Sequence, residues 1–187
     1  MTPMYQRNVP PPIISFNHGQ FLTQMAYWIK PENYLELGIH TGGTLKSVSQ
    51  YCRASTGVDV ALSYVDQIMP SHVKLVESTT DDFIAGLDPS TQYDMVFIDA
   101  WHSHEQSLKD FINIHPFVIE EGFIFLHDTS PCNDELLKPE FCNDCYKTPL
   151  YIKTHFIEDF ELVTLPFNPG LTIVKKIKRS KQLSWKE

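Results

Sequence analysis

The sequence is 187 residues long, which is the size of one ordinary domain with a substantial buried core. Its hydrophobic content of 42% and its aromatic content of 12% exclude an intrinsically disordered chain. A formal net charge of -8 argues against a nucleic-acid-binding surface, which would be expected to carry a basic stripe.

Membrane insertion and secretion are also disfavoured. No apolar run approaches the roughly 20 residues that a membrane-spanning helix needs, and residues 1–6 lack the apolar core of a signal peptide. The lysine-rich stretch at 175–181 is more simply a charged edge strand with a solvated tail. We therefore expect a cytoplasmic protein with neither a nucleic-acid nor a membrane partner.

The first residues are polar and rich in proline, and residues 1–19 are predicted to form an N-terminal arm of a single domain that spans residues 1–187. Phe21, Met25 and Trp28 then recur with the period of an amphipathic helix, which ends at Pro31. We expect this helix to cover one face of a sheet or a ligand-binding cleft.

Strands and helices alternate from residue 34 onward. Residues 34–37 form an apolar run typical of a buried strand, and Leu45, Val48 and Cys52 give the period of the helix that follows. Further strands are expected at residues 57–59, 73–76, 94–99 and 123–126.

Capping patterns and apolar spacing predict the helices between these strands. One helical segment is expected through Leu62, Val65 and Ile68. Another begins at Thr79 or Thr80, and Ser103 opens a third. A last helix is expected to begin at residue 149, with residue 148 as its cap.

The C-terminal part of the chain carries two strand-like runs joined by a proline- and glycine-containing turn. These runs cover residues 160–165 and 171–176, and they predict an antiparallel hairpin. Five strand–helix units followed by such a hairpin predict an α/β fold: a doubly wound, mostly parallel sheet of Rossmann-like type. Residues 129–148 are expected to form a loop insertion.

A glycine-rich turn follows the first strand of this sheet. Gly38, Gly42 and Gly43 give the spacing G-x-x-x-G-G, which differs from the G-x-G-x-x-G of dinucleotide-binding turns. Glu36 lies two residues before the turn and would repel a diphosphate, whereas it suits an ammonium group. A ligand with ammonium and carboxylate groups, such as an amino acid, therefore fits better.

Polar residues also end the later strands, and ligands of open α/β sheets bind at that edge. Asp59 ends the second strand about 20 residues past the turn, where it would accept both hydroxyls of a ribose or cap the next helix. Asp99 and His102 follow the fourth strand, and His127 and Asp128 follow the fifth. The two carboxylates suit one divalent cation such as Mg²⁺, with His127 as a third contact.

The pattern Glu36-x-Gly38-x-x-x-Gly42 resembles the first motif of the class I S-adenosylmethionine-dependent methyltransferases. Metal-dependent enzymes of the catechol O-methyltransferase type carry an Asp after the fourth strand and an Asp-Asn pair after the fifth. Here Asp99 and Asp128 occupy those places, while Thr129 replaces the Asn. Phe-Ile-Asp-x-x-His followed by His-Asp-Thr is closer still to small bacterial and viral methyltransferase-like proteins often attached to sugar or antibiotic pathways.

The resemblance implies a role for each motif. The turn would hold the methionine end of S-adenosylmethionine, Asp59 the ribose, and Ser78 or Thr79 the adenine side. His102 matches the position of a lysine base in the catechol-type enzymes, and Trp101 would form a wall of the cofactor pocket. The implied cofactor-binding residues are Glu36, Gly38, His40, Thr41, Gly42, Gly43, Thr44, Asp59, Ser78, Thr79, Asp99 and Trp101.

We therefore expect an S-adenosylmethionine-dependent methyltransferase that acts on a small hydroxylated acceptor, either a sugar or a phenol. His102, Asp99 and Asp128 are the expected catalytic residues, and Asp99, Asp128 and His127 the expected metal ligands. The alternative is a protein of the same fold that binds the cofactor without turnover. The sequence leaves open whether the protein forms a homo-oligomer.

Cys132, Cys142 and Cys145 share the expected loop, and the last two have the C-x-x-C spacing of zinc and redox sites. Reduced thiols are the simpler interpretation, because one such pair is a weak signal. A structural zinc would need a fourth ligand, either His127 or His155.

Overall fold

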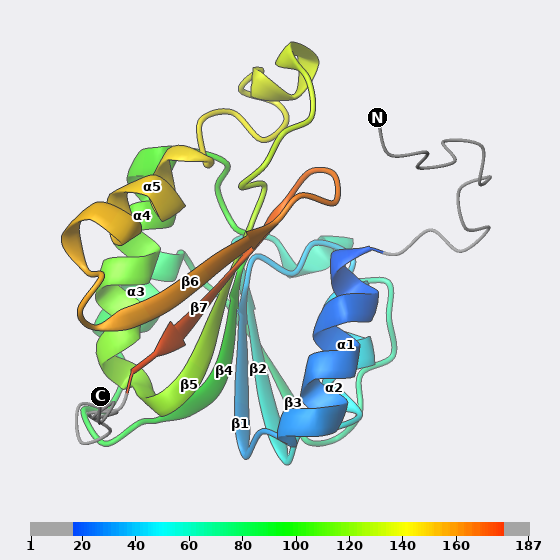
Figure 1. The fold of residues 1–187 in the computed structure, drawn as a ribbon. Coiled ribbons are helices and arrows are strands. Elements are labelled where there is room, and N and C mark those ends of the chain that lie inside the picture. The colour runs from blue at the N-terminus through cyan, green and yellow to red at the C-terminus, as the bar shows by residue number, and fades with distance from the viewer. Residues whose placement is uncertain (1–16, 178–187) are drawn as a thin grey trace, which may run out of the picture.

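The computed structural model describes residues 17–177, which form a seven-stranded sheet covered by helices on both faces (Figure 1). The strand order is β3-β2-β1-β4-β5-β7-β6. The strands are β1 (Asn33–Leu37), β2 (Ala54–Asp59), β3 (Val73–Glu77), β4 (Tyr93–Ile98), β5 (Val118–His127), β6 (Phe160–Leu165) and β7 (Leu171–Lys176).

Strands β1 to β5 run parallel to one another, while β7 pairs antiparallel with both β5 and β6. The predicted doubly wound, mostly parallel sheet with a C-terminal antiparallel hairpin is therefore confirmed. The hairpin places β7 between β5 and β6, so β6 is an edge strand.

Helices pack on both faces of this sheet. Helices α1 (His18–Ile29) and α2 (Gly43–Ser49) lie on one face, and α3 (Thr80–Ala85), α4 (His104–Ile114) and α5 (Lys147–His155) lie on the other (Figure 1). Short 3₁₀ helices occur at Leu62–Tyr64, His115–Phe117 and Asp134–Leu137. Parallel strands covered on both faces need apolar side chains on both, which explains their continuous apolar sequences.

Two hydrophobic cores result, one on each face of the sheet. Met95 and Phe97 of β4 face α1 and α2, whereas Val96 and Ile98 face the other layer. This division follows from the alternation of side chains along a strand.

Three local predictions were wrong. Trp28 is 73% exposed, because α1 buries Leu22 and Ala26 instead. The helix predicted through Ile68 is only the 3₁₀ turn Leu62–Tyr64, and Ile68 is exposed. Helix α5 begins at Lys147 with Tyr146 as its cap, two residues before the predicted start.

The carboxyl ends of β1 and β4 lie side by side at the centre of the sheet. The chain leaves β1 towards β2 on one side, and β4 is followed by β5 on the other side. Such a reversal of strand order opens a crevice where ligands bind in α/β folds. The sequence-predicted site residues lie at or just after the carboxyl ends of β1 to β5.

Two further expectations concern the N-terminal arm and membrane insertion. Most of the expected N-terminal arm lies outside the described residues, and Asn17 to Gly19 form the cap and first turn of α1. Within residues 17–177, no helix combines the length and the apolar character that a membrane crossing requires.

Candidate functional site

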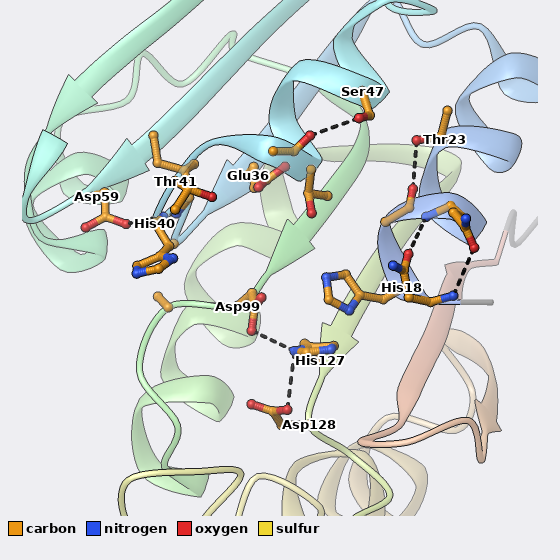
Figure 2. A pocket seen from close by; sticks show the side chains of 18 of the residues that line it. His18, Thr23, Glu36, His40, Thr41, Ser47, Asp59, Asp99, His127 and Asp128 are labelled. Carbon is orange, nitrogen blue, oxygen red and sulfur yellow. Dashed lines mark hydrogen bonds and ion pairs between the residues drawn. The ribbon is translucent and has the colours of Figure 1, made fainter. Parts of the chain in front are cut away.

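A large pocket opens at the carboxyl ends of β1, β4 and β5. Its volume is about 1340 Å³, which exceeds the roughly 300–1,000 Å³ typical of a site for one small molecule. Figure 2 shows His18 of α1, Glu36 of β1, Asp99 after β4 and His127 of β5 around this space. The pocket therefore has room for a cofactor and a second substrate.

Glycines shape the turn between β1 and α2. Gly38 has a φ of 84°, and a Cβ atom at this position would overlap the backbone carbonyl oxygen of Asp99. Gly42 has a φ of 82°, and a Cβ atom there would overlap the side chain of Met69. Both conformations are rare for residues with side chains. Gly38 thus lets the ends of β1 and β4 approach each other closely, and Gly42 lets the turn pack against Met69.

Asp59 holds this turn in place. Its Oδ2 atom accepts hydrogen bonds from the backbone N–H groups of Ile39 and His40, both at 2.9 Å, and its Oδ1 atom accepts one from Ala61 at 3.1 Å. An ionised carboxylate offers about four acceptor positions. Asp59 can therefore hold the turn and still accept from a ligand hydroxyl.

A second pocket of about 330 Å³ lies on the other side of Asp59. Gly38, Asp59 and Trp101 line both pockets, so the two spaces meet at this carboxylate. Ser78 and Thr79 line the smaller pocket. The arrangement suits one elongated ligand that passes Asp59.

Thr79 also has a structural role, because its hydroxyl oxygen accepts from the backbone N–H of Asp82 as the N-cap of α3. Gln106 lines the same small pocket, although the sequence analysis did not select it. Its amide donates to Thr80 and Asp110, so α3 and α4 are joined there. In the sequence, the only feature that marks Gln106 is its place in the capping-box pattern that Ser103 opens.

Glu36 is buried at the floor of the large pocket, with 2% of its surface exposed. Burial raises the pKa of its carboxyl group to about 8, since the charged form loses hydration. The hydroxyl of Tyr34 donates to its Oε2 atom at 2.6 Å. A cationic group in the pocket would favour the ionised carboxylate.

Four side chains converge where β4 and β5 end. His127 Nδ1 lies 2.9 Å from Asp99 Oδ1 and 3.3 Å from Asp128 Oδ1. His102 Nε2 lies 3.2 Å from Asp128 Oδ2 and 3.6 Å from Asp99 Oδ1. Although burial acts to raise it, the pKa of Asp99 is held below its ordinary value by the two histidines.

The second ring nitrogen of His102 restricts how this cluster is protonated. Nδ1 lies 2.6 Å from the carbonyl oxygen of Phe141, and a carbonyl only accepts, so Nδ1 carries a hydrogen. Nε2, which faces two carboxylates, must then bind either a proton or a cation. The hydrogen bond to Asp99 raises the pKa of His102 to about 9, against the effect of burial.

Among the described residues, one group has ligand atoms close enough to share a metal ion: Asp99, His102 and Asp128, whose atoms lie within 4.8 Å of one another. The sequence prediction had His127 in place of His102. Thr129 is directed elsewhere, because its hydroxyl accepts from Thr172 in the interior. The donor set of two carboxylates and one imidazole suits a divalent cation.

His127 and His18 form a further pair that the sequence analysis did not anticipate. The Nε2 atom of His127 is buried without a hydrogen-bond partner, and its ring centroid lies 4.0 Å from that of His18 (Figure 2). Burial lowers the pKa of His18 to about 4, so its ring is neutral at pH 7. Only the packing of α1 on the sheet brings these distant residues together.

One of the three loop cysteines contacts the metal-binding group. Cys142 and Cys145 are buried, whereas Cys132 is exposed, and all three are free thiols. The Cys142 thiol donates to Asp128 Oδ1 at 3.4 Å, and burial raises its pKa to about 12. Among the described residues no cysteine belongs to a group of side chains whose ligand atoms could share a metal ion, so the zinc alternative finds no ligand set there.

Replacing Glu36 by glutamine tests the state of this buried carboxyl. Its pKa rises from 4.5 unfolded to about 8 folded, so the folded protein keeps a proton that the unfolded chain loses between these values. Its stabilising contribution is full below the unfolded pKa and is lost as the pH rises towards 8, by at most about 1.4 kcal/mol per unit. The Glu36→Gln variant should lack this loss.

Urea unfolding at several pH values between those limits measures this difference. The free energy of unfolding should fall more steeply with pH in the parent than in Glu36→Gln. The exposed Glu158 provides the control, since Glu158→Gln should keep the parental slope. Equal slopes in the parent and Glu36→Gln would mean that Glu36 is not protonated in the folded protein.

No curated protein matches this chain at a significant level. Solved structures do share its fold. A caffeoyl-CoA O-methyltransferase candidate from Staphylococcus aureus is 16% identical with a TM-score of 0.71, over 88% of this chain and 85% of that chain. The O-methyltransferase TomG of Streptomyces achromogenes, involved in tomaymycin synthesis and solved with S-adenosylmethionine, is 14% identical with a TM-score of 0.71, over 91% and 84%.

An O-methyltransferase from Bacillus cereus, solved with S-adenosylhomocysteine, is 12% identical with a TM-score of 0.67, over 90% of this chain and 84% of that chain. At these identities the likeness establishes the fold. The sequence itself gives the family, since a profile described as a methyltransferase domain matches residues 17–129, more than half of the chain. This chain belongs to that family, within the class I S-adenosylmethionine-dependent methyltransferases.

Proposed function

We propose that this protein transfers the methyl group of S-adenosylmethionine to a hydroxyl group of a small acceptor. The observation that carries the proposal is the pair of pockets that meet at Asp59, with a buried acid at the floor of the larger one. S-adenosylmethionine has a matching shape, because its ribose lies between an amino-acid end and an adenine.

The charges around the larger pocket support this orientation. Glu36 suits the ammonium group of the methionine end, and the turn from Gly38 to Thr44 offers backbone groups to it. Asp59 would accept from the ribose hydroxyls, with the adenine between Trp101 and Ser78 or Thr79. Among residues 17–177, no Lys or Arg lines either pocket, which disfavours a dinucleotide diphosphate.

Methyl transfer to oxygen forms a carbon–oxygen bond while the carbon–sulfur bond of the sulfonium breaks. The acceptor hydroxyl loses its proton, and S-adenosylhomocysteine leaves as a neutral thioether. The sulfonium is already a good leaving group, so the protein chiefly aligns the acceptor oxygen with the methyl carbon and removes the proton.

Asp99, His102 and Asp128 would hold a divalent cation beside the acceptor. The fit rests on His102, whose Nε2 faces two carboxylates while Nδ1 donates to Phe141. A bound cation supplies Lewis acidity, which lowers the pKa of the acceptor hydroxyl. His102 is the expected base where its Nε2 atom binds no cation, and it is a ligand where that atom does. It can accept a proton only when Nε2 is free, and the unpartnered Nε2 of His127 is a neighbouring acceptor.

Calorimetric titration with S-adenosylmethionine, followed by an assay for S-adenosylhomocysteine formation, tests the proposal as a whole. We expect one cofactor site per chain and acceptor-dependent turnover with sugars or phenols. Binding without methyl consumption over such a panel would support the alternative of a non-catalytic binding protein. Absence of cofactor binding would contradict both functions.

Asp59→Ala should weaken S-adenosylmethionine binding by more than about tenfold, because a hydrogen-bonded carboxylate at the ribose is lost. Asp94→Ala is the matched control: Asp94 also accepts a backbone N–H, that of Asn33 at 2.8 Å, but it lies at the opposite end of the sheet. The control should leave the dissociation constant within about twofold of the parent. An unchanged constant for Asp59→Ala would contradict the ribose role.

His102→Ala should lower turnover by about a hundredfold or more while sparing cofactor affinity, since general-base or ligand roles contribute at least that much. His155→Ala, which removes an exposed histidine of α5, should leave turnover unchanged. Treatment with EDTA should also lower the rate of the parent, and Mg²⁺ or Mn²⁺ should restore it. A rate insensitive to EDTA would contradict the metal, and full activity of His102→Ala would contradict both roles of His102.

A further inference from the structure

The larger pocket continues beyond the strand ends into a groove between α1 and α2, which we term the α1–α2 groove. Its polar lining consists of Gln20, Thr23 and Gln24 from α1 and Thr44, Ser47 and Gln50 from the α2 side. Apart from Thr44, which also ends the glycine turn, these residues lie outside the part of the pocket that Glu36, the glycine turn and Asp59 provide for the cofactor. The groove therefore belongs to the space left for the acceptor.

Helical spacing produces this lining. On α1, positions 20, 23 and 24 lie on one face, while Leu22 and Ala26 point into the core. On the α2 side, positions 44, 47 and 50 recur every three residues, while Leu45 and Val48 are buried. Each helix thus directs an apolar face towards the sheet and an uncharged polar face towards the groove.

Local hydrogen bonds determine what these side chains offer a ligand. The Oε1 atom of Gln20 accepts from the backbone of Asn17, which leaves its amide N–H₂ group to donate. The hydroxyls of Thr23 and Ser47 donate to the carbonyls of Gly19 and Gly43, at 2.7 and 2.9 Å, which leaves their oxygens to accept (Figure 2). The groove therefore offers a ligand both donors and acceptors.

Charge restricts the ligand further. No Lys or Arg lines the pocket within residues 17–177, while Glu36, Asp59, Asp99 and Asp128 all do. A phosphorylated or carboxylated acceptor would find no Lys or Arg among these lining residues and would face acidic side chains instead. A phenol would make fewer hydrogen bonds with the amides and hydroxyls of the groove than a glycoside would.

Aromatic rings close the far end of the groove. Tyr27 and Tyr51 line the pocket there, and their rings meet edge to face with centroids 5.5 Å apart. Both are partly exposed, at 47% and 40%. Tyrosine combines an apolar ring with a polar hydroxyl, so the pair can pack on the C–H face of a sugar ring while its hydroxyls stay hydrated.

We propose that the α1–α2 groove binds a neutral glycoside, and that the hydroxyl to be methylated belongs to its sugar at the strand ends. This rests on the proposed function of the site. The start of α1 lies at the acid–histidine cluster, because His18 packs on His127. From there to Tyr27 the helix rises about 14 Å, so the groove is long enough for more than one sugar ring.

Saturation-transfer NMR of the full-length protein, with saturating S-adenosylhomocysteine, tests this binding without requiring turnover. The probes are methyl α-glucoside, methyl α-rhamnoside and maltotriose as neutral glycosides, glucose 6-phosphate and glucuronate as anions, and catechol as a phenol. We expect neutral glycosides to bind, maltotriose more tightly than the monosaccharides, and the anions to bind at least about tenfold more weakly. Preferred binding of catechol or of an anion, or no binding of any neutral glycoside at millimolar concentration, would overturn the proposal.

The variant Gln24→Ala/Gln50→Ala removes one amide from each wall of the groove. Its affinity for the bound glycoside should fall by about tenfold or more, since two hydrogen bonds are lost. Gln92→Ala, which alters an exposed glutamine outside both pockets, is the control. An unchanged glycoside affinity in the double variant would overturn the groove assignment.

The S-adenosylhomocysteine dissociation constant, measured on the same variants, separates this proposal from the function on which it rests. It should stay at the parental value in the double variant. A parent protein that does not bind S-adenosylhomocysteine would instead show that the proposed function has failed. Normal cofactor binding without glycoside binding would be consistent with the proposed methyltransferase function. It would contradict only the neutral glycoside as the acceptor.

Discussion

The carboxylate of Asp59 is the contact on which the site depends. It ends β2 and accepts backbone hydrogen bonds from both sides of the pocket, two from the turn after β1 and one from Ala61. The same carboxylate lines both pockets. A partly buried side chain that orders the turn therefore also stands where a ribose would lie, so the geometry of the proposed cofactor site is part of the folded structure. Gly38 completes it, since a side chain there would separate β1 from the end of β4.

Acidic side chains are concentrated around this contact, and they explain the ligands proposed here. Glu36 and Asp128 are buried, and Asp99 is partly buried beside two histidines. Acids held this close in the interior favour cations. In the proposed function, an ammonium group, a sulfonium and a divalent ion would each supply positive charge to one part of the pocket. The protein can therefore recognise a cationic cofactor without a lysine or arginine among the described lining residues.

The sequence predicted the sheet well, because alternation of apolar strands with helical segments is a local pattern. The strand-end acids could also be found, since parallel strands bring their carboxyl ends to one edge. Local patterns failed where tertiary packing decides. Trp28 fits an amphipathic period, yet α1 turns Leu22 and Ala26 to the core. The convergence of His102 with Asp128, and the contact of His18 with His127, depend on loop and helix packing that no spacing encodes.

The central claim is that one ligand passes Asp59, with an amino-acid end beside Glu36 and a nucleoside in the smaller pocket. The most direct test is a crystal structure of the complex with S-adenosylhomocysteine. We expect the ribose hydroxyls within hydrogen-bonding distance of Asp59, the adenine near Trp101 and Ser78, and the amino group towards Glu36. A ligand that leaves the smaller pocket empty, or that places its amino acid away from Glu36, would contradict the account.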